Sequence, residues 1–112
     1  MLKVTTIAEG AKNLTVLIKG TLTEELALTP VLKVDQLVKL ESALWLVQEK
    51  AGLLLWWEKG NLIMPMESRN FVRLDIGWNS PRGDWDRTIL MSSFGVGQGP
   101  KAFAVVLDFD KQ

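Results

Sequence analysis

The sequence contains no cysteine, no histidine and no tyrosine. Without cysteine there can be no disulfide bond, and without cysteine and histidine the usual zinc and iron–sulfur ligands are missing. The same absences exclude Ser-His-Asp and Cys-His nucleophile systems, as well as acid–base catalysis by imidazole. We therefore expect a protein that is not an enzyme and that has no catalytic residue, no cofactor and no metal ion.

An excess of charge and long apolar runs are missing too. Thirteen basic residues balance thirteen acidic ones, whereas a nucleic-acid-binding surface is normally basic. The longest apolar runs, from Ala43 to Val47 and from Gly52 to Trp57, are far shorter than the roughly 20 residues of a membrane-spanning helix. The N-terminus also lacks the pattern of a signal peptide. The sequence predicts synthesis in the cytoplasm and neither nucleic acid nor membrane as a partner.

The composition that is present suits one globular domain. Apolar residues make up 47% of the 112 positions. A chain of this length typically buries somewhat more than about 60% of its unfolded surface. One hydrophobic core can therefore stabilise it without disulfide bonds or a structural metal ion. We expect a single domain that covers the whole chain.

Alternating apolar and polar residues predict β-strands along most of the chain. From Asn13 to Lys19 every second residue is apolar, and Gly20 ends the pattern. From Lys101 to Asp110 the alternation is longer still. Shorter strands are predicted from Leu53 to Glu58, Asn61 to Met66, Asn70 to Ile76 and Asp86 to Met91. Such spacing is typical of an antiparallel β-sandwich or jelly roll, which is the all-β fold class that we predict.

Pro65 and the glycines near the C-terminus indicate how the strands are arranged. Pro65 is expected on an edge strand or at a bulge, because proline cannot donate to a central ladder. The segment from Gly95 to Gly99 lacks the Gly-Lys-Ser/Thr ending of a phosphate-binding loop, so we expect a hairpin connection there.

The segment from Val34 to Lys50 has two interpretations. Leucines and valines at helical spacing, with Asp35 as a cap and Gly52 as a stop, would suit an amphipathic helix. An extended strand would instead turn at Lys50-Ala51-Gly52 into the next strand, and we favour this hairpin because every neighbouring segment is a strand. In the extended interpretation two sets of residues alternate between the faces of the strand. Val38, Leu40, Leu44 and Leu46 lie on one face, and Lys39, Glu41, Trp45 and Glu49 lie on the other.

Arginine and tryptophan gather in one part of the chain. Every basic residue before Gly60 is lysine, whereas all four arginines lie between Arg69 and Arg87, together with Trp78 and Trp85. These two residue types are enriched at protein–protein interfaces, where lysine is depleted. The segment from Gly77 to Asp86 is therefore either a partner-binding loop or an ordinary loop whose tryptophans fold back over the sandwich edge.

Trp56 and Trp57 are adjacent, so in a strand they should point to opposite faces. One indole should enter the core while the other lies on the sheet surface. The outer indole could pack on the sheet, meet a subunit or stack on a sugar. A carbohydrate-binding module could use Trp57, Trp78 and Trp85 in this way.

Carboxylates are the catalytic groups that remain. Glu67 with Asp75, or Asp84 with Asp86, has the chemistry of a glycosidase pair, but nothing in the spacing selects them from thirteen acidic residues. A calcium site at Asp84 and Asp86 would lack the oxygen ligands of an EF-hand loop. Solvated surface carboxylates explain these residues better.

The chain from about Leu32 to Lys111 resembles small virion proteins of tailed bacteriophages. The likeness follows strands and turns rather than one signature. It rests on Lys33-Val34-Asp35, the stretches Gly52 to Glu58 and Asn61 to Met66, Asn70-Phe71, Leu74-Asp75, Gly83-Asp84, and a closing hairpin from Ile89 through Phe94-Gly95 to Val105 and Asp110. The first thirty residues match less well, so they either complete the sandwich or act as an arm on a neighbouring subunit.

This resemblance implies a capsid decoration, or cement, protein on the virion surface. Such a protein would form symmetric dimers or trimers and bridge subunits of the major capsid protein through buried area. Two other roles remain open, a carbohydrate-binding module and a phage tail or adaptor component. The residues that we expect at the protein interface are Trp57, Arg69, Arg73, Trp78, Arg82 and Trp85.

Overall fold

The computed structural model describes residues 2–48, 50–67 and 72–112, and for residues 72–76 it describes the backbone. Within these residues the chain forms nine β-strands and no helix. None of the described residues therefore belongs to a helix that could span a membrane. The strands are β1 (Leu2–Glu9), β2 (Asn13–Leu22), β3 (Thr29–Lys33), β4 (Val38–Val47), β5 (Gly52–Glu58), β6 (Asn61–Glu67), β7 (Val72–Asn79), β8 (Thr88–Phe94) and β9 (Lys101–Lys111).

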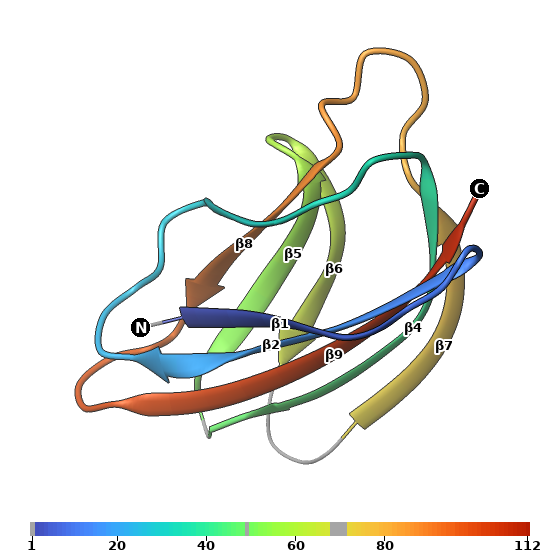
Figure 1. The fold of residues 1–112 in the computed structure, drawn as a ribbon. Helices are drawn as coiled ribbons and strands as arrows, with labels where there is room; N and C mark the ends of the chain where they lie inside the picture. Colours follow the sequence, from blue (N-terminus) through green and yellow to red (C-terminus); the bar gives the residue numbers. More distant parts are fainter. Residues whose placement is uncertain (1, 49, 68–71) are drawn as a thin grey trace.

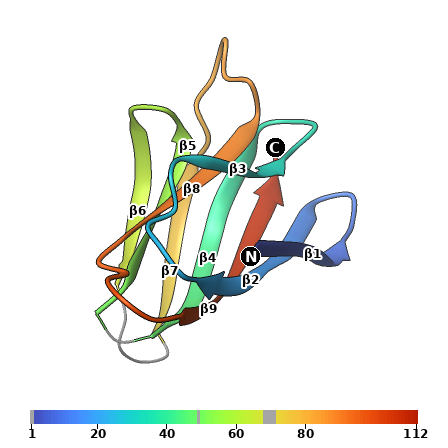
Figure 2. The same ribbon diagram turned by 90° about the vertical axis from the view of Figure 1, so that its left-hand side faces the viewer.

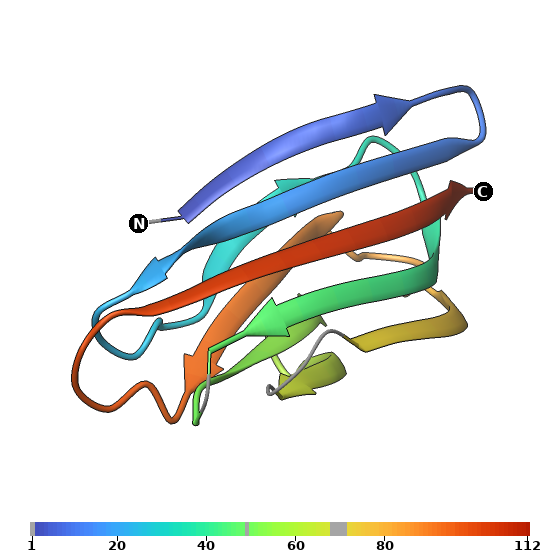
Figure 3. The ribbon, with the colours of Figure 1, turned by 90° about the horizontal axis from the view of Figure 1, so that it is seen from below.

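The strands form two antiparallel sheets that face each other (Figures 1 and 2). Sheet A has the order β1-β2-β9-β4-β7, and sheet B has the order β3-β8-β5-β6. Figure 3 shows β1, β2, β9 and β4 side by side in sheet A. The predicted all-β antiparallel sandwich is confirmed.

The strand pairing is nested from the ends of the chain inward. β2 pairs with β9, β3 with β8, β4 with β7 and β5 with β6. A long hairpin wound in this way into two sheets of four strands is a jelly roll, and β1 adds a fifth strand to sheet A beside β2. The first thirty residues thus supply the edge strand of sheet A and one of its inner strands.

Two predicted hairpins are wrong. β4 belongs to sheet A and β5 to sheet B, so the turn at Lys50-Ala51-Gly52 carries the chain across the core instead of back along the same sheet. The segment from Gly95 to Gly99 likewise connects β8 of sheet B to β9 of sheet A. Of the strands in direct succession, β1 and β2 form a hairpin in sheet A, and β5 and β6 form one in sheet B. In the first of these the Gly10 amide donates to the Asn13 carbonyl.

Val38–Val47 is a strand, but the predicted facing of its second half is wrong. Leu40 and Ser42 pair with the consecutive residues Phe109 and Asp108 of β9, so Glu41 is an extra residue in the ladder. A bulge of this kind reverses the alternation beyond it. Trp45 is consequently buried and Leu46 exposed, the reverse of the expectation.

The core lies between the inner faces of the two sheets. β2 contributes Val16 and Ile18, and β9 contributes Val105 and Leu107, all four fully buried. At the margin the Trp45 indole Nε1 donates a hydrogen bond to the Glu67 carbonyl at 2.9 Å, which links sheet A to sheet B. Pro65 lies on β6, an edge strand of sheet B, as predicted.

Candidate protein-binding surface

Trp57 and Trp85 pack against each other inside the protein. Trp57 on β5 is 5% exposed and Trp85 is 6% exposed. Their rings meet edge to face, with centroids 5.6 Å apart, and the Trp85 Nε1 donates to the Trp57 carbonyl at 2.6 Å. Both indoles are therefore largely inaccessible to a partner, and Trp85 follows the alternative in which it folds back onto the sandwich.

Trp56 and Trp57 point to opposite faces, as predicted. Trp56 is half-buried on the outer face of sheet B, where its Nε1 donates to the Ser92 Oγ at 3.0 Å. Trp57 is the indole that enters the core. The chain itself thus supplies the surroundings of both indoles.

The connection from β7 to β8 is held at both ends. The Ser80 amide donates to the Val38 carbonyl at 2.7 Å, and the Val38 amide donates to the Ser80 Oγ at 3.0 Å. At the other end the Arg87 guanidinium donates to the Asp35 carbonyl at 2.7 Å. The connection rises above the sandwich in Figure 1, and Trp85 anchors it from within.

Trp78 is the exposed tryptophan of this region. It pairs with Leu40, whose side chain is fully buried, so Trp78 lies on the core side of sheet A. Because β7 is an edge strand, 45% of Trp78 nevertheless remains exposed. An exposed indole at an open sheet edge is typical of a contact residue.

A hollow of about 450 Å³ lies between β6 and β7, where the two sheets end on the same side. It is lined by residues of both edge strands and by Trp57 behind them. We call this surface the edge hollow, and its residues are Trp57, Leu62, Ile63, Gly77, Trp78 and Asn79. Leu62 and Trp78 supply its exposed apolar area, at 44% and 45% exposure.

Leu62 was missed by the sequence analysis. Leu55 pairs with Met64 and Trp56 with Leu62, so Ile63 is an extra residue in β6. Ile63 and Met64 are both buried as a result, and Leu62 is pushed outward. The sequence holds no signal of this, because a bulge depends on how β6 pairs with β5.

Of the three arginines predicted at the interface, the structure describes the side chain of one. Arg82 is exposed in the connection between β7 and β8, next to Gly83. Arg69 lies outside the described residues. The backbone of Arg73 belongs to β7 opposite Leu44, and its side chain lies outside the described part.

Among the described residues, no three acidic side chains lie close enough together to hold a metal ion. Asp84 is exposed, and the Asp86 Oδ1 accepts a hydrogen bond from the Thr88 amide at 3.0 Å. Glu67 is exposed at the end of β6, and the side chain of Asp75 lies outside the described part. The predicted surface role of Asp84 and Asp86 agrees with this placement.

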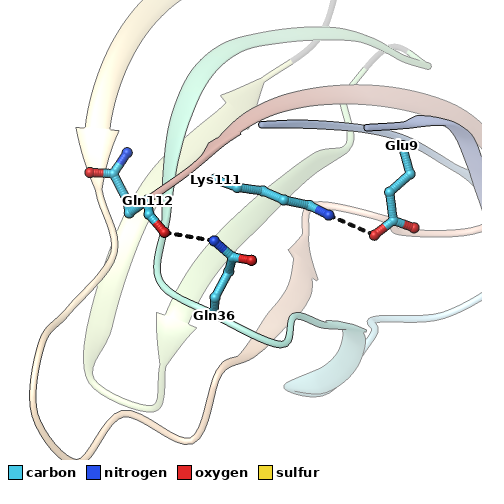
Figure 4. Close-up of polar contacts among 4 residues, drawn as sticks. All are labelled: Glu9, Gln36, Lys111 and Gln112. Atoms are coloured by element: carbon cyan, nitrogen blue, oxygen red, sulfur yellow. Dashed lines mark hydrogen bonds and ion pairs between the residues drawn. The ribbon is translucent and has the colours of Figure 1, made fainter. Parts of the chain in front are cut away.

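A second hollow, of about 200 Å³, lies between β1 and the segment around Val34. Figure 4 shows the polar contacts beside it. The Lys111 Nζ lies 2.8 Å from the Glu9 Oε2, and the Gln36 Nε2 donates to the Gln112 carbonyl at 2.6 Å. The side chain of Lys111 is only 10% exposed and is occupied by this ion pair, so these groups fasten β1 and the C-terminus to the sandwich.

Comparisons with protein-family models, with curated proteins and with solved structures found no match to this chain.

Proposed function

We propose that this protein is a non-enzymatic structural component of a tailed-phage virion, a decoration protein that binds across subunits of the major capsid protein on the outside of the head. The observation that carries the proposal is the edge hollow, in which Leu62 and Trp78 are each almost half exposed on adjacent edges of the two sheets. The phage context comes from the resemblance of the strand and turn pattern.

The edge hollow has the composition of a protein contact. Tryptophan brings a large, rigid contact area with few side-chain torsions to restrict, and leucine adds apolar area beside it. The backbones of β6 and β7 at this margin lack a further strand partner within the described residues. An apolar hollow flanked by two unpaired strand edges suits a loop or strand of another protein.

The jelly roll is compatible with this role but does not establish it. The fold occurs in viral capsid proteins, and it also occurs in lectins and cupins. The lectin alternative loses support from the placement of Trp57 and Trp85, because two of the three indoles that it would use are buried. Of these three tryptophans, Trp78 is the exposed one.

The test is cosedimentation of the purified protein with empty heads assembled from the major capsid protein of the same genome. Wild-type protein should sediment with the heads. Trp78→Ala should weaken binding by about 2 kcal/mol or more, which is about thirtyfold in the dissociation constant. Leu28→Ala is the matched control, since Leu28 is exposed but lies in the connection between β2 and β3.

Two outcomes would contradict the proposal. Wild-type protein that stays in the supernatant would exclude a decoration role. Equal binding of Trp78→Ala and wild type would show that the contact lies outside the edge hollow. A tryptophan fluorescence shift on adding glycans, without binding to heads, would instead support the carbohydrate-binding alternative.

A further inference from the structure

The outer face of sheet A carries an apolar row where polar residues are normal. The outward face of an antiparallel sheet in a sandwich usually alternates to polar side chains. Here Leu17 of β2, Val106 of β9 and Leu44 of β4 stand opposite one another in register. They alternate with fully buried neighbours, so their side chains lie on the outer face, each partly exposed.

The next row on this face widens the apolar area. Ala104 of β9 pairs with Leu46 of β4, and Leu46 is 48% exposed, more than any other described leucine. No described segment of the chain covers these residues, as sheet A lies open on this side (Figure 3). A contiguous apolar patch rimmed by polar residues marks an interaction surface.

Charges of opposite sign flank the apolar row on its two sides. On the side of Ala104, Lys19 pairs with Lys3 of β1, and both lysines are exposed. On the other side Asp108 and Asp110 follow Val106 along β9.

The Asp108 carboxylate is fixed in place by its neighbours on the sheet. The Thr15 and Ser42 hydroxyls donate to its two oxygens, each at 2.7 Å. Lys39 of β4 pairs with Asp110 in the ladder and lies 3.6 Å from the Glu41 carboxylate, so it offsets one of the acidic charges on this flank, which keeps an excess of negative charge.

We propose that two copies of this chain dimerise through the outer faces of their A sheets. A twofold axis that runs along the row of Leu17, Val106 and Leu44 packs this row against its own copy. The same axis lays the Lys19 side of each copy over the Asp108 side of the other. Opposite charges therefore face each other at two symmetry-related places in the dimer. An axis along the strands would instead place the aspartates of one copy over those of the other, and the repulsion between them disfavours this packing.

A second copy fits this face better than an unrelated protein because the pattern is self-complementary. An isologous interface requires that one patch match itself after rotation, and a central apolar row between a basic and an acidic flank meets this requirement. The edge hollow lies on the margin formed by β6 and β7 and stays free in the dimer. The dimer would therefore present two edge hollows, which gives bivalent binding to any partner. The dimer itself does not rest on the proposed function.

The test is the mass of the purified protein by light scattering and sedimentation over a wide range of concentration. Wild type should show twice the monomer mass and dissociate on dilution. Leu46→Glu should remain monomeric throughout, because it places a carboxylate in the apolar area. Leu62→Glu is the matched control, an equally exposed leucine in sheet B, and should dimerise as wild type does.

A charge exchange tests the orientation of the two copies. Lys19→Glu should raise the dimer dissociation constant by at least about tenfold, and adding Asp108→Lys to it should restore most of the affinity, because the axis lays the row of Lys19 over the row of Asp108. Both side chains lie on the outer face of sheet A, and circular dichroism serves to check that each variant is folded. A monomer at every concentration would overturn the proposal. A dimer that persists in Leu46→Glu, or that is lost in Leu62→Glu, would place the interface elsewhere.

Discussion

At the scale of single residues, the tryptophans separate into structural and exposed side chains. Trp45, Trp57 and Trp85 are buried, and the indole nitrogens of Trp45 and Trp85 donate to carbonyl groups. Trp78 is exposed at a strand edge. The sequence predicted that Trp56 and Trp57 face opposite sides of a strand, but the packing of the sheets decides that Trp45 and Trp85 are buried while Trp78 is exposed.

We predict that Trp85→Phe lowers the free energy of unfolding by about 1–3 kcal/mol, because it removes the donor to the buried Trp57 carbonyl. Trp78→Phe is the control and should change stability by less than about 0.5 kcal/mol, since Trp78 lies at the surface. Urea unfolding followed by circular dichroism measures both. Equal stability of the two variants would show that Trp85 is not an anchor of the connection between β7 and β8.

Gly95 is a residue that the chain needs where it leaves sheet B. Its φ is +67°, and a Cβ at this position would collide with the Lys50 carbonyl oxygen of the neighbouring crossover. Gly97 has a similar φ of +63°, but a Cβ there would meet nothing within 4 Å. Comparing alanine substitutions at the two glycines therefore separates the cost of a positive φ from the cost of a steric collision.

Gly97→Ala should lose about 1 kcal/mol of stability, because a non-glycine residue pays a conformational cost at positive φ. Gly95→Ala should lose at least about 1–3 kcal/mol more, the cost of a collision that the backbone must relieve. The midpoint of thermal unfolding of each variant provides the comparison. If the two midpoints agree, the two crossovers are not packed together as described.

At the scale of elements, the strands were predictable and their partners were not. Alternation identified β2 and β9, and short apolar segments bounded by turn residues identified β5, β6 and β8. Pairing depends on contacts distant in sequence, such as Leu14 with Phe109. For this reason the two hairpins expected between successive strands proved to be crossovers between sheets.

The bulge at Glu41 determines which side chains of β4 face the core, and the local sequence pattern does not predict it. It aligns Val38 and Leu40 with Trp45 and Val47 on the core side of β4. The alternation of the sequence alone places Trp45 on the opposite face. A single extra residue thus decides which side chains of β4 are available on the outer face of sheet A.

Deleting Glu41 should preserve the fold, because the remaining residues of β4 then alternate regularly between core and surface. We expect a loss of less than about 3 kcal/mol, from the changed local twist. Deleting Leu44 should prevent folding, since it turns Trp45 and Val47 away from the core. Dispersion of amide signals in a proton–nitrogen NMR spectrum distinguishes the two results, and a folded Leu44 deletion would contradict the register of β4.

At the scale of the whole molecule, the two candidate surfaces have different origins. The edge hollow arises where β6 and β7 end the two sheets together, and its predictable part was Trp78. The outer face of sheet A is formed by side chains from β2, β9 and β4, which are far apart in the sequence. Its apolar row could not be recognised before the register of these strands was known.

The two surfaces together suit a bridging protein. A dimer formed through sheet A would carry an edge hollow on each copy, so that one particle could contact two subunits of a lattice. Two contacts linked in one rigid body bind more tightly than either alone.

The most direct test of the proposed function is a cryo-electron microscopy map of empty heads incubated with the protein. The account predicts density for paired jelly rolls on the outer surface of the head, above junctions between capsid subunits, with β6 and β7 facing the shell. Heads that remain bare at saturating protein, or density in which Trp78 faces solvent, would contradict it.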